Sequence, residues 1–273
     1  MDIRYGAKSD VGLKRDVNED RFCTAPDLGL YVICDGMGGH NAGEVASGLA
    51  IEVIKKHVQE VVQDPGRPLL GYDDPAFSPQ TNRLASAIRL ANHVVNAEAQ
   101  ARPSLAGMGT TVVSAVLGEQ TLSVAHVGDS RLYLIRGESI QLLTADHSLV
   151  AEQIREGLLS EAEAERSPRK NILTRALGVE ATVDVELGEV PVMSGDVVLL
   201  CSDGLTRHVS PADIMSAVRE ARHPQEVSER LVEMANATGG EDNTTVILVT
   251  VSNGSTPGLL SRIVNRIVSR ILP

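Results

Sequence analysis

Three strand-like runs that follow one another closely constrain the fold of this chain most. Each is rich in β-branched residues, and together they span Thr110–Leu117, Leu122–Val127 and Arg131–Arg136. Parallel neighbours in a sheet need a crossover of a dozen or more residues, and only short turns separate these runs. We therefore predict that they form an antiparallel meander. Further strands are predicted at Leu30–Cys34, Val197–Cys201 and Thr244–Val251.

Apolar residues at helical spacing predict five helices, at Ala42–Val62, Gln80–Ala101, His147–Glu156, Pro211–Arg219 and Gln225–Ala237. Ser210 is the expected N-cap of the fourth helix, because Pro211 follows at the first helical position. Long helices and grouped strands that do not alternate strictly favour α+β layers over a doubly wound sheet. The proline-rich segment 64–79 is expected to be an exposed loop, and the charged segment 157–173 is a candidate flap.

Composition narrows the functional classes. A formal net charge of -11 argues against nucleic acid as a partner, because the chain repels phosphate backbones. The charge fits simple solubility, and it equally fits carboxylates that bind cations. No apolar run approaches the roughly 20 residues of a membrane span, and the first ten residues resemble no signal peptide. Cys23, Cys34 and Cys201 form no CxxC pattern and are expected to be buried in a reducing compartment, so we predict a cytoplasmic protein.

Carboxylates cluster beside the predicted strands. They stand at Glu19, Asp20, Asp35, Asp129, Asp203 and Asp242. Converging carboxylates repel, and their burial costs several kcal/mol unless a cation compensates. Oxygen ligands without a His or Cys cluster suit Mg²⁺, Mn²⁺ or Ca²⁺ better than zinc. Asp-Gly after a strand is also common turn chemistry, so a turn is the better explanation of any single position. The positions together predict a metal site with oxygen ligands.

Arg15 precedes the Glu19–Asp20 pair closely. Taken alone it is a surface arginine, but beside a metal–carboxylate cluster it becomes a candidate phosphate ligand, since arginine binds phosphate bidentately. Other phosphate and metal motifs are missing: the sequence has neither an EF-hand loop nor a Walker P-loop. The glycines of 36–39 fail the dinucleotide-binding spacing, because Asn41 stands where the third glycine is required.

Seven short motifs occur in an order that resembles the type 2C protein phosphatases, in particular their compact bacterial members. They are RDVNED (15–20), DGMGGHNAGEVAS (35–47), GMGTT (107–111), VGDSR (127–131), LTADHS (143–148), CSDGL (201–205) and GGEDNTTV (239–246). The resemblance covers residues 2–251. It implies a four-layer α-β-β-α sandwich, in which two antiparallel sheets pack face to face between helix pairs. It also implies hydrolysis of phosphoserine and phosphothreonine on proteins.

The resemblance also implies metal ligands. Asp35 would bridge two Mn²⁺ or Mg²⁺ ions, and the Gly36 carbonyl would bind one of them. Asp203 and Asp242 would bind the other ion. Asp129, together with Asp203, would help to form a weaker third metal site. In the reaction that the family performs, water activated between the two ions attacks phosphorus in line with the leaving oxygen.

Other positions complete the implied site. Glu19 and Asp20 would hold metal-bound waters or bind the ions directly, and Arg15 would bind the substrate phosphate. The chain departs from animal members of the family, which carry a histidine where Met37 stands here. His40 stands three residues later and is a candidate general acid, but it equally fits a residue that orders the loop and begins the helix. His126 is assigned to strand packing and His147 to a turn.

Two other functions remain as alternatives. One is a catalytically silent family member that serves as a binding module, although such a protein should have lost ligands. The other is a metal-dependent phosphodiesterase or nuclease, which the negative charge disfavours. For the phosphatase, the resemblance implies phosphoprotein substrates and opposition to a bacterial-type Ser/Thr kinase.

The C-terminal residues lie outside the resemblance, so we divide the chain into a phosphatase domain at 1–252, a linker at 253–258 and a C-terminal segment at 259–273. Apolar pairs recur every four residues in this segment, and Arg262, Arg266 and Arg270 fill the other face. The pattern predicts a basic amphipathic helix. It would pack on its own domain, dock on another protein, or bind an anionic membrane weakly.

Overall fold

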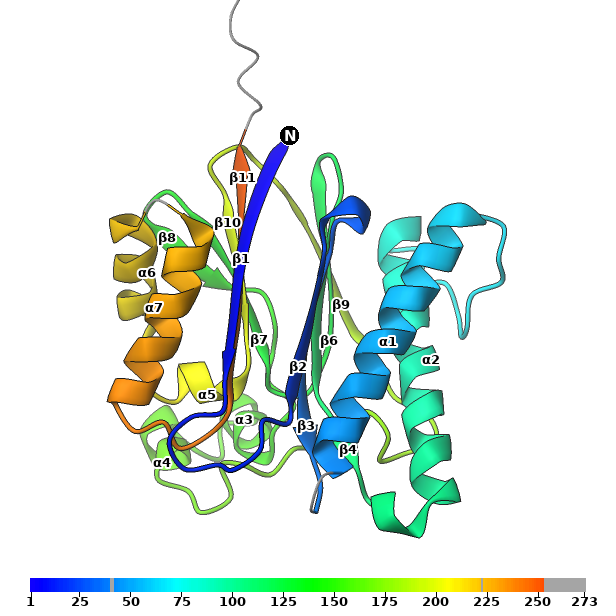
Figure 1. Ribbon diagram of the computed structural model, residues 1–273, viewed down its shortest axis with the longest axis horizontal. Coiled ribbons are helices and arrows are strands. Elements are labelled where there is room, and N and C mark those ends of the chain that lie inside the picture. The colour runs from blue at the N-terminus through cyan, green and yellow to red at the C-terminus, as the bar shows by residue number, and fades with distance from the viewer. Residues whose placement is uncertain (40–41, 222, 253–273) are drawn as a thin grey trace, which may run out of the picture.

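The computed structural model describes residues 1–39, 42–221 and 223–252. Figure 1 shows four layers: α6 and α7, one sheet, the second sheet, and then α1 and α2. The predicted α-β-β-α sandwich is therefore confirmed. The linker 253–258 and the C-terminal segment 259–273 lie outside the described residues, as does His40.

Both sheets are antiparallel throughout. The first has the order β1-β11-β10-β7-β8, formed by Asp2–Asp10, Thr244–Ser252, Val197–Cys201, Arg131–Arg136 and Ser139–Leu142. The second has the order β2-β3-β5-β6-β9, formed by Asp20–Ala25, Leu30–Met37, Val112–Leu117, Thr121–Val127 and Glu186–Pro191. The short strand β4 (Gly109–Thr110) adds to β3 at its end.

Helices cover the outer faces of the two sheets (Figure 1). On the second sheet lie α1 (Ala42–Gln63) and α2 (Pro79–Ala101), and on the first lie α6 (Pro211–Glu220) and α7 (Pro224–Ala237). Shorter helices lie in the loops, at α3 (Leu149–Arg155), α4 (Glu161–Glu165), α5 (Asp203–Thr206), η1 (Pro26–Leu28) and η2 (Pro103–Leu105). No helix of the described residues is long and apolar enough to span a bilayer.

The centre of the molecule is the aliphatic layer between the sheets. Ile33 and Leu122 of the second sheet pack there with Leu132, Leu200 and Ile247 of the first. All five side chains are fully buried. Adjacent residues of a strand point to opposite faces, so Leu30, Val32 and Cys34 of β3 contact the core beneath α1 and α2 instead. The apolar run of β3 is thus explained by burial on both faces, and it fixes the position of Asp35 at its end.

The predicted meander is wrong in its third member. β5 and β6 do pair, but β7 belongs to the opposite sheet, between β10 and β8. The turn Gly128–Ser130 carries the chain across the sandwich, and Gly128 has a φ of +108° there, which favours glycine. The crossing is favourable because it brings Leu132 and Leu134 into the layer between the sheets.

The predicted helices are confirmed within two residues at each end. Ser210 caps α6 as expected: its hydroxyl accepts a hydrogen bond from the Asp213 N–H at 3.2 Å. Segment 64–79 is mostly exposed, as predicted. The candidate flap 157–173 contains α4, and backbone hydrogen bonding between Leu149 and Ile172 joins its end to the start of α3.

Candidate metal centre

Strand pairing brings the predicted carboxylates to one end of the sandwich, near α5 and the end of β3 (Figure 1). Asp20 begins β2 and lies directly opposite Asp35 on β3. In the first sheet β10 pairs with β11, so Asp203, just after β10, lies near Asp242, just before β11. Asp129 lies in the turn that crosses between the sheets. Five of the six predicted carboxylates thus come from strand ends and turns of both sheets.

Asp35 is held at the centre of this group. Its backbone carbonyl accepts hydrogen bonds from the Thr111 N–H at 2.8 Å and the Thr110 hydroxyl at 2.9 Å. Burial raises the pKa of the Asp35 carboxyl well above its usual value, and the charges of nearby aspartates raise it further; they are Asp20, Asp203, Asp129 and Asp242. These four carboxylates therefore lie near enough to Asp35 to act on its charge. In the absence of a cation, the ionised form of Asp35 is strongly disfavoured.

Asp20 is the most deeply buried acid of the group, with 2% of its surface exposed. Its Oδ2 accepts hydrogen bonds from the Ser202 hydroxyl at 2.8 Å and the Thr245 hydroxyl at 2.6 Å. Burial nevertheless raises the pKa of Asp20 to about 6, with the charges of Asp203 and Asp242 also contributing. The two hydroxyls therefore orient the carboxylate without supplying enough positive charge to keep it ionised.

Three carboxylate oxygens of the cluster are buried without a hydrogen-bond partner among the described residues. They are Glu19 Oε1, Asp20 Oδ1 and Asp203 Oδ1. A buried polar atom without a partner retains its full desolvation cost, of about 1–3 kcal/mol or more when charged. A cation bound among these atoms would remove that cost. Because the donors are all oxygens, the residues present fit Mn²⁺ or Mg²⁺.

Two arginines contact the outer carboxylate of the cluster. Asp242 Oδ2 accepts hydrogen bonds from Arg15 Nη2 at 3.0 Å and from Arg207 Nη1 at 3.1 Å. Arg207 also forms an ion pair with Asp203. The sequence predicted Arg15 as a residue of the site, but Arg207 was not predicted. The available signal was its position four residues after Asp203, the spacing at which side chains on one helical turn meet.

The loop around Asp242 is fixed by Asn243. The Asn243 amide donates to the backbone carbonyls of Val11 at 3.0 Å and Val17 at 3.1 Å. Its Oδ1 accepts from the Glu19 N–H at 2.8 Å. This single side chain therefore fixes the segment that carries Arg15 and Glu19 against the start of β11.

Gly36 is required by the close approach of α1. A Cβ atom at this position would lie 2.1 Å from the Gly43 carbonyl oxygen and 2.7 Å from the Glu19 carbonyl oxygen. Both contacts are with backbone, so a side chain here would force the first turn of α1 away from β3. The absence of a side chain also leaves the Gly36 backbone close to Asp35 and Glu19.

We expect Gly36→Ala to destabilise the protein by roughly 2 kcal/mol or more, because the added methyl group overpacks a backbone contact. The matched control is Gly48→Ala on α1, where a Cβ meets nothing within 4 Å. That control should stabilise the helix by roughly 0.5–1 kcal/mol. Urea unfolding of both variants measures the two effects. Equal stability of Gly36→Ala and the native protein would contradict the contact.

Asp129 lies in the turn between β6 and β7 and interacts electrostatically with Asp203 of the carboxylate cluster. Burial, together with the charges of Asp203 and Asp146, raises the pKa of Asp129 to about 7, although the charge of Arg207 lowers it. The predicted general acid, His40, lies outside the described residues, so its distance from the cluster stays untested.

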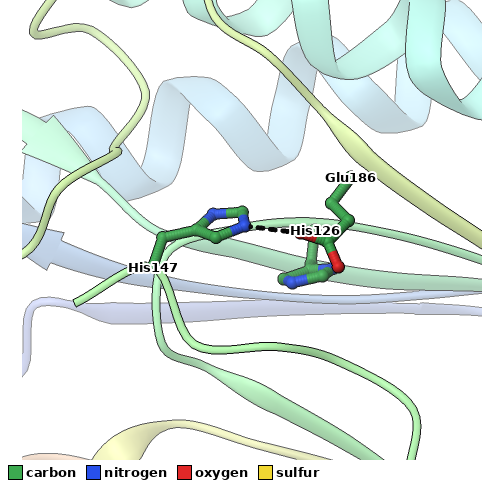
Figure 2. A group of neighbouring side chains, drawn as sticks. All are labelled: His126, His147 and Glu186. Atoms are coloured by element: carbon green, nitrogen blue, oxygen red, sulfur yellow. Dashed lines mark hydrogen bonds and ion pairs between the residues drawn. The ribbon is translucent and has the colours of Figure 1, made fainter. Parts of the chain in front are cut away.

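Figure 2 shows a second group of potential ligands, which includes none of the predicted aspartates. His126, His147 and Glu186 have ligand atoms within 4.8 Å of one another. His147 Nδ1 accepts from the Gly128 N–H at 3.1 Å, so its proton lies on Nε2 and points to Glu186 Oε2 at 3.0 Å. Both nitrogens of His147 are therefore engaged in hydrogen bonds. The His126 ring stacks on the His147 ring. We interpret the group as structural: it fixes the turn at Gly128.

A cavity of about 330 Å³ opens beside the end of β3. Met37, two residues after Asp35, lines one side. The other sides consist of residues between Asn171 and Asp184, which begin within the end of the candidate flap and include Arg175. The walls of this cavity combine polar, charged and apolar side chains, and none of the six predicted carboxylates lines it.

Comparison with known proteins identifies the family. The family model described as "Protein phosphatase 2C" matches residues 14–246. The chain belongs to the protein phosphatase 2C family, as the motifs predicted.

The relatives support this assignment over nearly the whole described chain. The serine/threonine phosphatase stp of Listeria innocua is 38% identical over 245 residues, which cover 89% of this chain and 93% of the relative. The crystal structure of the Mycobacterium tuberculosis serine/threonine phosphatase PstP/Ppp is 34% identical, with a TM-score of 0.80 over 92% of this chain and 99% of the other. The catalytic domain of PstP in complex with two manganese ions is 35% identical, with a TM-score of 0.77 and the same coverage.

Proposed function

We propose that this chain is a serine/threonine protein phosphatase that hydrolyses phosphoserine and phosphothreonine with the help of two Mn²⁺ or Mg²⁺ ions. One observation carries the proposal: buried carboxylates converge in a protein phosphatase 2C fold, and three of their oxygens have no partner among the described residues. The similar catalytic domain solved with two manganese ions supports the choice and number of ions.

Four residues of the chain are proposed to bind the ions. Asp35, the Gly36 carbonyl, Asp203 and Asp242 hold the two ions. When bound, the ions supply Lewis acidity and lower the pKa of a water molecule toward neutrality. Asp35 has the central place because four other carboxylates act on it. Its position is fixed because Thr110 and Thr111 donate hydrogen bonds to its backbone carbonyl.

Glu19 and Asp20 complete the inner surface of the site. Each has one unpartnered buried oxygen, which suits direct binding of an ion or a hydrogen bond from a water on it. Asp20 has its other oxygen fixed by Ser202 and Thr245, so its free oxygen is oriented in advance. Such preorganisation avoids reorganisation during the reaction.

Arg15 binds the substrate phosphate. Its side chain is 50% exposed and reaches the cluster from outside, where a phosphoryl group would arrive. It contacts Asp242 with one nitrogen and has further N–H donors for phosphate oxygens. His40 is proposed to protonate the leaving serine or threonine oxygen. The cavity beside Met37 accommodates the substrate residues next to the phosphorylated side chain.

The test is hydrolysis of a phosphothreonine peptide by the native protein in EDTA and in Mn²⁺, with a phosphodiester and plasmid DNA as competing substrates. Release of phosphate from the peptide only in Mn²⁺, with plasmid left intact, is the expected result. Cleavage of the plasmid would favour the nuclease alternative. A folded protein without activity in any divalent ion would favour the silent binding module.

We also propose the physiological partners of this activity. The substrates are phosphorylated proteins, and the chain opposes a Ser/Thr kinase in the cytoplasm.

The proposed domain organisation keeps the division made from the sequence. Residues 1–252 form the catalytic domain, with 157–173 as a flap. For residues 259–273, which lie outside the described residues, we keep the proposal of a basic amphipathic helix that docks on the domain, on another protein or weakly on a membrane.

We expect a chain that ends at Ser252 to keep the native kcat/KM toward a phosphothreonine peptide. The reason is that the family model and all the site residues end before that position. Steady-state kinetics of the full and shortened chains in Mn²⁺ make the comparison. A loss of activity on shortening, with native thermal stability retained, would assign the tail to the catalytic unit.

A further inference from the structure

The side chain of His147 joins the turn between β6 and β7 to β9, an edge strand of the second sheet. The ring is fully buried. Its Nδ1 accepts a hydrogen bond from the Gly128 N–H at 3.1 Å, and the His147 N–H donates to the Gly128 carbonyl at 3.0 Å. Its Nε2 donates to Glu186 Oε2 at 3.0 Å, as Figure 2 shows. One residue therefore binds both backbone polar groups of Gly128.

Glu186 and His126 fix the orientation of this ring. Glu186 lies directly opposite His126 in the pairing of β6 with β9. The His126 ring stacks on the His147 ring, with centroids 4.8 Å apart and planes inclined at 17°. Burial lowers the pKa of His147, which favours the neutral ring. The partner of one ring nitrogen decides which nitrogen carries the proton, and here Glu186 leaves Nδ1 as an acceptor.

The turn has a second anchor, which leads to the metal centre. The hydroxyls of Ser130 and Thr111 are hydrogen-bonded at 2.8 Å, and both side chains are buried. Thr111 Oγ1 also accepts from the Asp35 N–H at 3.1 Å, and the Thr111 N–H donates to the Asp35 carbonyl at 2.8 Å. Continuous hydrogen bonding therefore connects Ser130 with the backbone of Asp35.

Asp129 lies between the two anchors. Gly128 is held by His147 and Ser130 by Thr111, so the backbone is fixed on both sides of Asp129. Gly128 also packs tightly, because a Cβ there would lie 2.6 Å from the Thr111 side chain. Metal ligands depend on surrounding hydrogen bonds that hold them in place.

We propose that His147 and Glu186 are positioning residues of the metal centre. They fix the turn that carries Asp129 and, through the second anchor, the backbone of Asp35. The inference rests on the proposed phosphatase site, in which Asp35 is the central ligand and Asp129 belongs to the same cluster of acids. In this role His147 and Glu186 contact neither an ion nor the substrate, and they act through their hydrogen bonds.

The backbone of His147 makes a separate contact. Its carbonyl accepts from the Thr174 N–H at 2.9 Å, and Thr174 lines the cavity beside Met37. That hydrogen bond does not involve the ring. A substitution of the side chain should therefore alter the metal centre and leave the wall of the cavity in place.

The test is the affinity for Mn²⁺, measured from the electron paramagnetic resonance signal of the free ion. His147→Ala is expected to bind Mn²⁺ about tenfold more weakly than the native protein, an effect typical of supporting residues around a metal site. The KM for a phosphothreonine peptide in saturating Mn²⁺ should stay near the native value. His147→Asn should restore most of the affinity, because its side-chain oxygen can accept from the Gly128 N–H.

The matched control is His57→Ala on α1. His57 is also buried, and its Nε2 lies 3.0 Å from Ser86 Oγ, but it has no hydrogen bond to the turn. Both alanine variants should unfold at a lower temperature in EDTA, since each loses a buried side chain and a hydrogen bond. Only His147→Ala should lose affinity for Mn²⁺. Ser130→Ala removes the second anchor with little change in volume, and it should also weaken Mn²⁺ binding.

Native affinity in His147→Ala, equal weakening in His57→Ala, or no recovery in His147→Asn would overturn the positioning role. If His147→Ala does not fold, native affinity in Ser130→Ala overturns it. A His147→Ala protein that binds one ion fewer, with unchanged affinity for the others, would make His147 a ligand and also overturn it. A native protein that binds no Mn²⁺ would instead overturn the proposed function.

Discussion

Replacing Asp35 by asparagine is expected to lower kcat/KM for a phosphothreonine peptide by about 10³-fold in saturating Mn²⁺. A metal centre contributes several kcal/mol of transition-state stabilisation, and each 1.36 kcal/mol is a factor of ten in rate. Asp35 is the residue whose removal should cost most, because it lies at the centre of the carboxylate group. An amide oxygen keeps the shape of the side chain but carries no charge to hold two cations.

The same substitution should make the metal-free protein more stable. Burial and four neighbouring aspartates disfavour the charged form of Asp35, so a neutral side chain removes a repulsion. The matched control is Asp73→Asn in the exposed 64–79 segment, which should change neither activity nor stability. Steady-state kinetics in Mn²⁺ and thermal unfolding in EDTA measure both effects. If the kcat/KM of Asp35→Asn stayed within tenfold of the native value, Asp35 would not be a ligand of the metal centre.

The metal-free protein is expected to lose stability as the pH rises from about 4 to about 7. The pKa of Asp20 rises from the usual 3.8 to about 6 in the folded state, and that of Asp129 to about 7. Between the unfolded and folded values, the folded state binds more protons than the unfolded state. The free energy of unfolding therefore falls with pH in this window. For Asp20, which is fully buried, the loss is about 3 kcal/mol, since one pKa unit corresponds to 1.36 kcal/mol.

Mn²⁺ should cancel this dependence, because bound ions keep the carboxylates ionised and stabilise the folded state by mass action. Urea unfolding at pH 4, 5, 6 and 7, in EDTA and in Mn²⁺, makes the comparison. Asp20→Asn is the control variant, and in EDTA it should flatten the dependence between pH 4 and 6. A metal-free stability that rises from pH 5 to pH 7 would show that these carboxylates are not buried together.

Much of the fold followed from local sequence. The long helices and the apolar strands were predictable, because each buries a face whose periodicity is visible in the chain. β1 was missed because DIRYGAKSD has no apolar run: most of its residues are at least partly exposed on an edge strand. The change of sheet after β6 was also missed. It depends on which sheet buries Leu132 and Leu134, and no local pattern records that choice.

The site shows a similar division. The motifs identified the acids, but strand register decides that Asp20 faces Asp35. The unpartnered oxygens of Glu19, Asp20 and Asp203 become apparent only when neighbouring atoms are known. The same holds for Arg207, which looks like an ordinary surface residue until its ion pairs are seen. The part of the site that the sequence did not predict is therefore the set of ion pairs and unpartnered oxygens that depend on residues distant in the chain.

The most direct test of the two-ion site is a crystal of the protein soaked in Mn²⁺, measured at the manganese absorption edge. The account predicts two anomalous peaks, both among Asp35, Asp203 and Asp242, with one near the Gly36 carbonyl. A peak between His126, His147 and Glu186 with none at the aspartates would contradict it. So would a cluster that remains free of manganese while the protein hydrolyses a phosphothreonine peptide.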